Sequence, residues 1–378
     1  MTIIADMVLL IATSPFVYYF LAIFSAWRYF RSSRQETATY TPPVSNLKPI
    51  HGVDPDAYEN FVSFCRQDYP EYELLFCAGS PLDKVVPILE KLKKDFPERR
   101  IRIIYRAEDG ASNDKVAKLA RLVEEASYDV LVFNDSDVRV ERDYLRTVVA
   151  PLARPEVGAV TCFYSSLRDT TLAANLHTIG MLSDFYAGLL VARQLDGVKF
   201  AIGKTIVARR DLIARFGGYE KLQNRPGDDL LTGRLIAEQG YEVDLLPYTV
   251  QTVSGAVGFS DLLHKRLRWM VVMRHMRAGG HFGLLFTQGL MWTAVAMLVH
   301  PTRAVLIGYP TAYLMLRVLM AWIIGHGLKE RGVWKRMPLI PLWDAAAFLL
   351  WLASFTRSSI RWRNGEYYIR NGELVPAE

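Results

Sequence analysis

The sequence predicts an α/β domain with a mostly parallel, doubly wound sheet, held between transmembrane helices at the two ends of the chain. In the middle of the chain, short segments rich in β-branched and aromatic residues alternate with segments of helical periodicity, which is typical of such a sheet. Hydrophobic residues make up 51% of the 378 residues and gather at both ends. One buried strand runs into the acidic turn Asp135-Ser136-Asp137, and ligands of open α/β sheets bind where strands end in this way.

The charge balance favours a membrane surface over a nucleic acid. The net charge is +6 and the pI is near 9.1, but many arginines and lysines flank apolar segments instead of clustering with aromatic residues. The widely spaced cysteines Cys65, Cys77 and Cys162 fit neither a disulfide framework nor a zinc site. We therefore expect the central domain in a reducing compartment.

The N-terminal segment is predicted to be a membrane anchor that covers residues 1–34. The run from residue 3 to residue 27 is largely apolar, and it is long enough to span about 30 Å of hydrocarbon. Arg28, Arg31 and Arg34 follow this run directly, whereas a signal peptide carries its positive charges before it. This polarity predicts a retained anchor in an inner or plasma membrane, with the N-terminus outside and the next domain cytoplasmic.

Residues 35–280 are predicted to form the sheet domain. Its strands are expected at residues 44–47, 73–77, 101–105, 128–134, 157–164 and 243–246. Its helices are expected at residues 54–66, 83–96, 115–127, 141–150, 169–195, 230–239 and 260–277. Asp54-Pro55 is a typical helix start, and Asp83 is expected to cap the next helix. The segment 169–195 suits the core and a membrane surface equally well, because its apolar pattern alone does not separate the two.

The C-terminal part is predicted to return to the membrane. Apolar segments at 282–299, 304–324 and 339–355 lie within a membrane region at 281–356, and a polar basic tail follows at 357–378. Three crossings would leave the basic loop at 329–336 on the cytoplasmic side and send the tail outside. Two crossings and one interfacial segment would reverse these sides, and the positive-inside rule does not choose between the two alternatives.

The acidic turn suits a bound cation. Asp135 and Asp137 are separated by one small residue, so both carboxylates can approach a divalent cation and the sugar of a nucleotide. Phosphate oxygens would then complete the ligands of Mg²⁺ or Mn²⁺. The structural alternative is a strand that ends in an Asx-rich turn.

A second motif, Gly203-Lys204-Thr205, invites a phosphate-loop interpretation. Such a loop requires a glycine five residues before the Gly-Lys pair. That position is Val198, and we therefore reject a phosphate loop here.

Four motifs in a fixed order resemble those of a known family. They are Leu47-Lys-Pro-Ile-His-Gly-Val-Asp-Pro55, Asp135-Ser-Asp-Val-Arg139, Asp228-Asp229 and Arg268-Trp269. Between its hydrophobic ends, the chain resembles the ceramide glucosyltransferases and their bacterial ceramide and hopanoid glycosyltransferase relatives, which are inverting enzymes of GT-A fold. The resemblance covers residues 1 to about 370. It implies that the sheet domain is a GT-A catalytic domain, which is Rossmann-like with a mostly parallel sheet.

The resemblance implies roles for the acidic residues. Asp135 would contact the nucleotide sugar, and Asp137 would hold a divalent cation, Mg²⁺ or Mn²⁺, that bridges the diphosphate. Asp229 would be the general base. The structural alternative is that Asp228 or Asp229 merely caps the helix that follows, and the pair allows both roles.

The resemblance also implies roles for basic and aromatic residues. Lys48, Pro49 and Lys115 would lie near the nucleotide. Arg268 and Trp269 would close over the diphosphate and the donor sugar, as part of the catalytic set. The alternatives are a membrane-facing charge at Arg268 and an interfacial anchor at Trp269.

Two positions depart from the family pattern. After the second strand the family has an acidic residue that contacts the uracil, whereas this chain has Ser80, with Asp83 as the nearest acid. The family also has Gln or Arg where this chain has Lys265, and a lysine supplies a charge without a planar fork. The departures concern recognition of the base and of the diphosphate.

These observations predict a membrane-bound inverting glycosyltransferase that moves a sugar, glucose by resemblance, from a UDP-sugar to a lipid hydroxyl. Ceramide is the first acceptor by resemblance, and a hopanoid lipid that receives N-acetylglucosamine is the second. A membrane-tethered protein that binds a sugar nucleotide without catalysis is an alternative. A processive polysaccharide synthase or a transporter would need more membrane spans.

Overall fold

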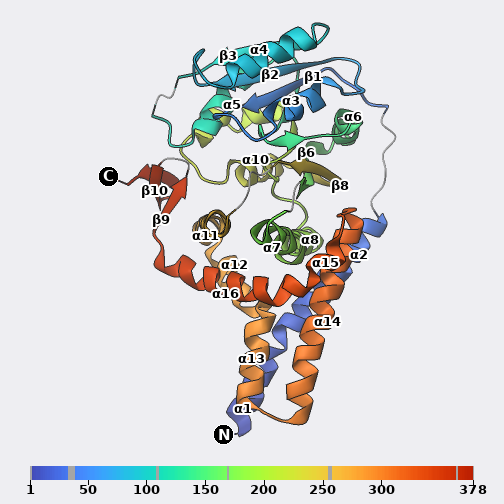
Figure 1. The fold of residues 1–378 in the computed structure, drawn as a ribbon, viewed down its shortest axis with the longest axis vertical. Helices are drawn as coiled ribbons and strands as arrows, with labels where there is room; N and C mark the ends of the chain where they lie inside the picture. Colours follow the sequence, from blue (N-terminus) through green and yellow to red (C-terminus); the bar gives the residue numbers. More distant parts are fainter. Residues whose placement is uncertain are drawn as a thin grey trace.

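A mixed β-sheet with helices on both faces forms one end of the molecule, and a helical layer with a stalk of long helices forms the other (Figure 1). The computed structural model describes residues 2–32, 39–107, 110–167, 170–253, 258–362 and 365–377. Arg34 of the predicted anchor lies outside the described residues. The predicted division of the chain at residues 35, 281 and 357 stays a prediction.

Within the described residues, eight strands form the main sheet in the order β3-β2-β1-β4-β7-β6-β8-β5. They are β3 (Arg100–Tyr105), β2 (Tyr72–Ala78), β1 (Val44–Pro49), β4 (Val130–Phe133), β7 (Ile206–Arg209), β6 (Val157–Ser166), β8 (Glu242–Thr252) and β5 (Val138–Arg139). Parallel pairing joins β3, β2, β1 and β4, and also β6 with β8, whereas β7 and β5 pair antiparallel with their neighbours. The predicted α/β class with a mostly parallel sheet is confirmed.

Helices cover both faces of the sheet, as a doubly wound arrangement requires. They are α3 (Ala57–Cys65), α4 (Val86–Asp95), α5 (Asp114–Glu125), α6 (Tyr144–Val149), α9 (Arg210–Arg215) and α10 (Asp228–Ala237). In β4, Val130 and Val132 join the core that contains residues of α3, α4 and α6, whereas Leu131 and Phe133 join the core that contains residues of α5, α9 and α10. Because side chains alternate along a strand, a strand covered on both faces is apolar at every position.

Two predicted helix starts are wrong. The helix expected from Asp54 begins at Ala57. Asp83 does not cap the next helix, which begins at Val86; its Oδ1 accepts a hydrogen bond from the Val85 N–H at 3.2 Å, ahead of the helix. Ahead of the first of these helices, the backbone carbonyl of Asp54 accepts a hydrogen bond from the Ala57 N–H at 3.2 Å. In both places a turn precedes the helix.

The sequence does not predict β7, or a small C-terminal sheet. β7 is inserted antiparallel between β4 and β6, and these partners are distant in the sequence. Within the described part of the predicted basic tail, β9 (Ser359–Trp362), β10 (Gly365–Arg370) and β11 (Glu373–Pro376) form a three-stranded antiparallel sheet. Arg363 of this tail lies outside the described residues.

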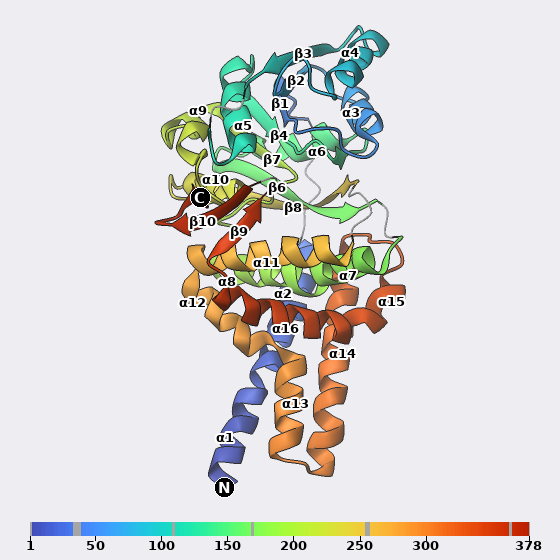
Figure 2. The ribbon, with the colours of Figure 1, turned by 60° about the vertical axis from the view of Figure 1, so that its left-hand side comes forward.

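A layer of helices lies between the main sheet and the stalk (Figure 2). It contains α7 (Leu172–Gly180), α8 (Tyr186–Asp196), α11 (Phe259–Met276) and α16 (Ile340–Thr356). Between α7 and α8, a π-helical turn runs from Met181 to Phe185. Met181 and Leu190 are buried in the core shared with the sheet, and Phe185 and Leu189 pack against it. The segment predicted to suit core or membrane therefore belongs to the core.

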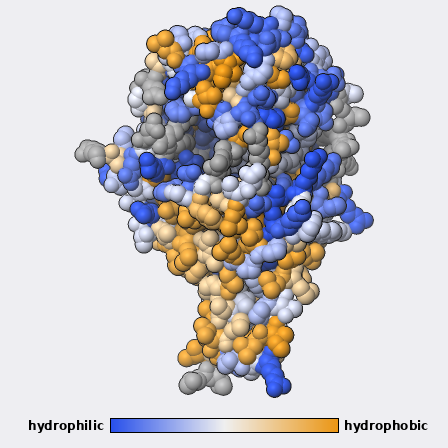
Figure 3. All heavy atoms as spheres, in the orientation of Figure 1, coloured by the Kyte–Doolittle hydropathy of each residue, from blue (hydrophilic) through white to orange (hydrophobic). Residues whose placement is uncertain are grey.

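The stalk is built from apolar helices. In the parts of the chain that the structure describes, three segments are long and apolar enough to span a membrane, and a bent helix pair would be a fourth: Ile3–Ser32, Arg303–Gly327, Val333–Thr356, and Ala278–Thr287 with Gly289–Val299, bent by 53°. The helices of the stalk are α1 (Thr2–Ala12), α2 (Ser14–Ser32), α13 (Gly289–Val299) and α14 (Arg303–Gly327). Leu298 is 82% exposed and Ile307 is 68% exposed, and the lower surface in Figure 3 is mainly apolar. The chain is therefore a membrane protein.

The last apolar helix, α16, runs across the stalk instead of along it (Figures 1 and 2). Its Trp343 packs so closely on α7 that a Cβ at Gly180 would lie 2.3 Å from the indole ring. Arg317 of α14 donates a hydrogen bond from Nε to Oδ2 of Asp344 in α16 at 3.0 Å. These two charges, which lie inside the C-terminal candidate spans, thus pair with each other and fix the crossing of α14 and α16.

The C-terminal sheet returns to the side of the main sheet. The Leu374 N–H donates to the Asn224 carbonyl at 2.6 Å, and Ser112 Oγ donates to the Leu374 carbonyl at 3.1 Å. The basic loop also begins on this side, because Thr249 Oγ1 of β8 donates to the Leu328 carbonyl at 3.4 Å. The structure therefore differs from both predicted topologies, which place the loop and the tail on opposite sides.

Gly233 of α10 permits a close approach to the segment before β7. A Cβ at position 233 would lie 2.3 Å from the carbonyl carbon of Phe200 and 2.4 Å from the nitrogen of Ala201, and these are backbone atoms. We predict that Gly233→Ala destabilises the fold by about 1–3 kcal/mol, the usual cost of overpacking. The measurement is the thermal unfolding midpoint of detergent-purified protein. Gly279→Ala in α12 (Ala278–Gly283) is the control, because a Cβ there meets nothing within 4 Å; equal midpoints would contradict the prediction.

Candidate active site

The acidic turn lies between β4 and β5, beside the end of β1. Asn134, the residue before the turn, is buried and connects the neighbouring segments. It accepts a hydrogen bond from Asn46 Nδ2 at 2.8 Å, and its own Nδ2 donates to the Lys204 carbonyl at 2.9 Å. The buried network therefore joins β1 and the end of β4 to the turn that precedes β7. The turn lies at a strand end, as predicted.

Two residues of the Leu47–Pro55 motif support this turn from within the protein. Lys48 is fully buried; its Nζ donates to the Asp135 carbonyl at 3.2 Å and lies 3.4 Å from the centre of the Phe64 ring. Burial lowers the pKa of Lys48 to about 7. Asp54 accepts a hydrogen bond from the Ser136 hydroxyl. These contacts fix the backbone of the acidic turn.

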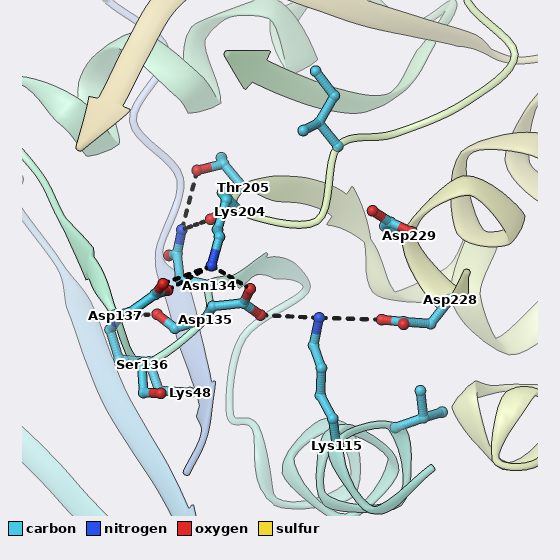
Figure 4. A network of polar contacts seen from close by, with 12 residues as sticks. Lys48, Lys115, Asn134, Asp135, Ser136, Asp137, Lys204, Thr205, Asp228 and Asp229 are labelled. Carbon is cyan, nitrogen blue, oxygen red and sulfur yellow. Dashed lines mark hydrogen bonds and ion pairs between the residues drawn. The ribbon is translucent and has the colours of Figure 1, made fainter. Parts of the chain in front are cut away.

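Five charged side chains of alternating sign cross the site (Figure 4). Lys204 Nζ lies 2.6 Å from Oδ1 of Asp137 and 3.0 Å from Oδ2 of Asp135. Lys115 Nζ lies 2.9 Å from Oδ1 of Asp135 and 3.3 Å from Oδ2 of Asp228. The side chains come from the acidic turn, the turn before β7, α5 and α10. The network therefore holds four separate segments around one point.

These pairs keep their charges at neutral pH. Burial alone would raise the pKa of Asp135, but Lys115 and Lys204 outweigh it and hold the pKa below its usual range. Burial alone would lower the pKa of Lys204, but Asp135 and Asp137 outweigh it and hold the pKa above its usual range. Each partner thus stabilises the charged form of the other.

Asp229 lies in the first turn of α10 and faces the turn before β7 (Figure 4). A Cβ at Gly203 would lie 2.8 Å from its Oδ2, so a larger residue there would displace this carboxylate. Its Oδ1 accepts a hydrogen bond from the Leu230 N–H at 2.8 Å. Burial, followed by the charge of Asp228, raises the pKa of Asp229 to about 6. The carboxyl group thus satisfies a free N–H at the helix start and is also a stronger base than an ordinary aspartate.

Helix α11 brings Trp269 and Lys265 toward the same region. The Trp269 ring packs against Phe185 at 5.5 Å between centroids, and the Arg266 guanidinium carbon lies 5.0 Å from the Trp269 ring. Trp269 is therefore partly buried against the core, and its place over the donor sugar stays a prediction. Burial, followed by the charge of Lys204, lowers the pKa of Lys265 to about 7. Arg268 is partly buried on the same helix, and its role at the diphosphate stays a prediction.

Some of the residues that the sequence predicts for the site are buried beneath it. Lys115 joins the charge network directly. Lys48 is buried beneath the turn, and Pro49 is buried at the end of β1. A direct contact of Lys48 or Pro49 with a nucleotide stays a prediction, and their observed role is to position Asp135 and its neighbours.

Lys204 is the central residue that sequence reasoning misses. It belongs to the Gly-Lys-Thr motif that fails as a phosphate loop, and its ammonium group nevertheless sits between two carboxylates. The available signal is a glycine followed by a lysine in a tight turn ahead of a strand. That signal does not identify Lys204 by itself. Only the pairing of β7 with β4 brings this lysine to the acidic turn.

Asp135 and Asp137 fit a hard divalent cation. Among the described residues, no group of three or more His, Cys, Asp or Glu side chains is arranged to hold a metal ion. Two carboxylates are sufficient for Mg²⁺ or Mn²⁺ where substrate phosphates supply further oxygens. Here both carboxylates already bind a cation, the ammonium group of Lys204. The pair can therefore hold a metal in the place of that group.

Sequence comparison gives one family over nearly the whole chain. The profile of glycosyl transferase family 21 matches residues 7–375. Ceramide glucosyltransferase 3 of Caenorhabditis elegans is 21% identical over 98% of this chain and 84% of its own length. Ceramide glucosyltransferase 1 of the same organism is 24% identical over 61% of this chain and 49% of its own length. The β-monoglucosyldiacylglycerol synthase of Synechocystis is 26% identical over 54% of this chain and 42% of its own length.

Structure comparison supports the fold. A mannosyltransferase of Pyrobaculum calidifontis, solved in complex with GDP-mannose and Mn²⁺, superposes on this chain with a TM-score of 0.56. The superposition covers 92% of this chain and 98% of the mannosyltransferase, at 17% sequence identity. At this identity the likeness concerns the fold alone, and it confirms the predicted GT-A class.

The raised pKa of Asp229 predicts a pH-dependent effect on stability. The Asp229 carboxyl has a pKa of 3.8 in the unfolded chain and of about 6 in the folded chain, so the folded chain binds the proton more tightly. The contribution of this proton to folding stability is therefore full below pH 3.8 and is lost as the pH rises through about 6. We predict that Asp229→Asn raises the thermal unfolding midpoint at about pH 7.5 and raises it less at about pH 4.5, because asparagine has no charge to bury beside Asp228. Asp211→Asn, an exposed position in α9, is the control. A lower midpoint at the higher pH would contradict the environment described for Asp229.

Proposed function

The chain belongs to glycosyl transferase family 21, and on this premise we propose that it transfers glucose from a UDP-sugar to the hydroxyl group of a membrane lipid, ceramide first. The observation that carries the proposal is the contrast between two carboxyl environments. Asp135 is held ionised by two lysines, whereas burial raises the pKa of Asp229 to about 6. Groups with separated pKa values can divide charge stabilisation and proton transfer between them.

The proposed reaction is a single displacement with inversion. The acceptor oxygen forms a bond to the anomeric carbon while the bond from that carbon to the diphosphate oxygen breaks on the opposite face. UDP leaves with the electron pair of the broken bond, and the hydroxyl proton passes to Oδ2 of Asp229. A base with a pKa of about 6 is mostly ionised at neutral pH and still accepts a proton more readily than an ordinary aspartate.

On the donor side, Asp137 is proposed to hold Mg²⁺ or Mn²⁺, and Asp135 to contact the nucleotide sugar. A bound divalent cation would neutralise the charge that grows on the departing diphosphate. Lys115 lies 2.9 Å from Asp135 and keeps this carboxylate oriented. Lys48 keeps the backbone of the same residue in place from below. The protein thus fixes its charges before the donor arrives, which is what electrostatic catalysis requires.

Asp83 is proposed to replace the acidic residue that is absent at Ser80. A Cβ at Gly79 would lie 3.9 Å from Oδ2 of Asp83, so this carboxylate reaches the end of β2 although it is three residues further along the chain than Ser80. A carboxylate there can accept a hydrogen bond from the N3–H of uracil. This position supports UDP as the nucleotide.

Helix α11 is proposed to cover the diphosphate and the donor sugar. Trp269 offers an apolar ring, with Lys265 Nζ 5.4 Å from the ring centre. Arg268 is proposed to contact the diphosphate from the same helix. Positive groups placed where negative charge develops lower the barrier without moving during the reaction.

The lipid acceptor is proposed from the attachment of the protein to the membrane. The helical layer that contains α11 lies directly above the apolar stalk (Figure 2), and an amphiphile in the bilayer can present its hydroxyl group there. Relatives named ceramide glucosyltransferase support ceramide as the acceptor. Catalysis on the cytoplasmic side of an inner or plasma membrane is part of the proposal, because Arg28 and Arg31 follow the N-terminal apolar run and positive charges favour the cytoplasmic side.

The test of this function is a transfer screen on detergent-purified protein with Mg²⁺ or Mn²⁺. UDP-glucose, UDP-N-acetylglucosamine and UDP-galactose are each offered with ceramide, diacylglycerol and a hopanoid polyol. We expect a glucosylated ceramide, and we expect chelation of the cation to stop its formation. A product with another pair would correct the donor or the acceptor. Binding of UDP-sugars without transfer to any acceptor would support a binding protein instead, and unchanged transfer after exhaustive chelation would remove the metal role of Asp137.

We predict that Asp229→Asn lowers kcat by about 10²–10⁴-fold, the usual contribution of a general base. Binding of UDP should change little, because the loss concerns the transition state and not the ground state. Single-turnover transfer and UDP titration of the same preparation measure the two quantities. Asp211→Asn serves again as the exposed control. Wild-type turnover in Asp229→Asn would rule out this carboxylate as the base.

A further inference from the structure

Lys204 occupies the point where the two aspartates of the acidic turn converge (Figure 4). Its Nζ lies 2.6 Å and 2.8 Å from the two oxygens of Asp137, and 3.0 Å from Oδ2 of Asp135. Its side chain is only 18% exposed. Three carboxylate oxygens thus surround one ammonium group in the way that they would surround a metal ion.

The backbone that carries Lys204 is held firmly. The Lys204 carbonyl accepts a hydrogen bond from Asn134 Nδ2 at 2.9 Å, and the Thr205 N–H donates to the Ile202 carbonyl at 3.2 Å across a tight turn. On the other side, Gly203 lies against Asp229. The side chain, in contrast, is a flexible four-carbon stem that ends in a point charge. A change at this position is therefore expected in the side chain and not in the turn.

We propose that Lys204 is an internal counter-ion that keeps Asp135 and Asp137 closed to a divalent cation until a nucleoside diphosphate binds, and that its ammonium group then turns to the diphosphate. This inference rests on the proposed function, because it assigns a regulation to the same donor site. Lys204 is a positioning residue in the free protein and contacts substrate only in the donor complex.

Competition for the same oxygens is the physical basis of the proposal. An ammonium group and a divalent cation repel each other and cannot both occupy a space bounded by three shared oxygens. A metal therefore binds only to the fraction of molecules in which Lys204 has left, and its apparent affinity falls by that fraction. A diphosphate reverses the balance, because it offers the lysine a new anionic partner and offers the metal further oxygen ligands.

The consequence is coupled binding of metal and nucleotide. If UDP strengthens the binding of Mn²⁺ by some factor, then Mn²⁺ strengthens the binding of UDP by the same factor. The free protein would hold its catalytic carboxylates paired and stable, and the metal site would form only when the donor is present.

The experiment measures Mn²⁺ binding to the full-length, detergent-purified protein by the loss of the free Mn²⁺ signal in electron paramagnetic resonance. Titrations are run without nucleotide and with saturating UDP, on wild type, Lys204→Gln and Lys199→Gln. Lys199 is an exposed lysine that pairs with Asp196 at 2.6 Å, five residues before Lys204, and is the matched control. Thermal unfolding shows whether each variant is folded.

We expect Lys204→Gln to bind Mn²⁺ without nucleotide at least about tenfold more tightly than wild type, because the competing charge is gone. UDP should tighten Mn²⁺ binding by about tenfold or more in wild type and in Lys199→Gln, and by much less in Lys204→Gln. Binding of UDP without metal should weaken in Lys204→Gln, because the diphosphate loses the ammonium group.

Equal Mn²⁺ affinity of wild type and Lys204→Gln without nucleotide would overturn the proposal. If Lys204→Gln does not fold, the titrations of the wild-type protein decide. An Mn²⁺ affinity of wild type that UDP does not change would also overturn the proposal. These outcomes differ from failure of the proposed function. An enzyme that transfers sugar but shows neither effect refutes only the role of Lys204, whereas absence of transfer with every donor and acceptor refutes the function.

Discussion

The rest of the site depends on the pairing of the Asp135 carboxylate with two lysines. Its oxygens bind Lys115 and Lys204, and through them the segments that carry Asp137 and Asp228. Partly buried charges are costly unless they are paired, so each lysine is favourable only where it lies beside its carboxylates. The same pairing draws the start of α10 and the turn before β7 toward the end of β4.

The site gives its carboxyl groups different environments within a small space. Two lysines hold the pKa of Asp135 below its usual range, whereas burial and a neighbouring carboxylate raise the pKa of Asp229 to about 6. The separation arises from position alone, because both residues are aspartates. Gly203 lies against Asp229 and has no Cβ to fill the space beside that carboxylate. The glycine that makes the sequence look like a phosphate loop thus leaves room for the Asp229 carboxylate.

The membrane part of the protein supports the site as well as attaching it. Helix α16 crosses the stalk because Arg317 pairs with Asp344 and because Trp343 packs on Gly180. This crossing leaves the C-terminal strands on the side of the main sheet, where Leu374 is hydrogen-bonded to Asn224, three residues before Gly227 at the start of α10. The C-terminal end of the chain therefore meets the segment that leads to Asp228 and Asp229.

Local pattern in the sequence determined the alternation of strands and helices, the apolar ends, and the positions of Asp135, Asp137 and Asp229. These features depend on periodicity, on hydropathy and on short motifs, which are contained in neighbouring residues. Only the tertiary structure decided the place of Lys204, which meets Asp137 across 67 residues of sequence, because β7 pairs with β4 and β6. The direction of α16 is another such feature. Hydropathy makes that helix a possible membrane span, but the packing of its side chains on α7 and α14 sets its direction, and no local signal contains those contacts.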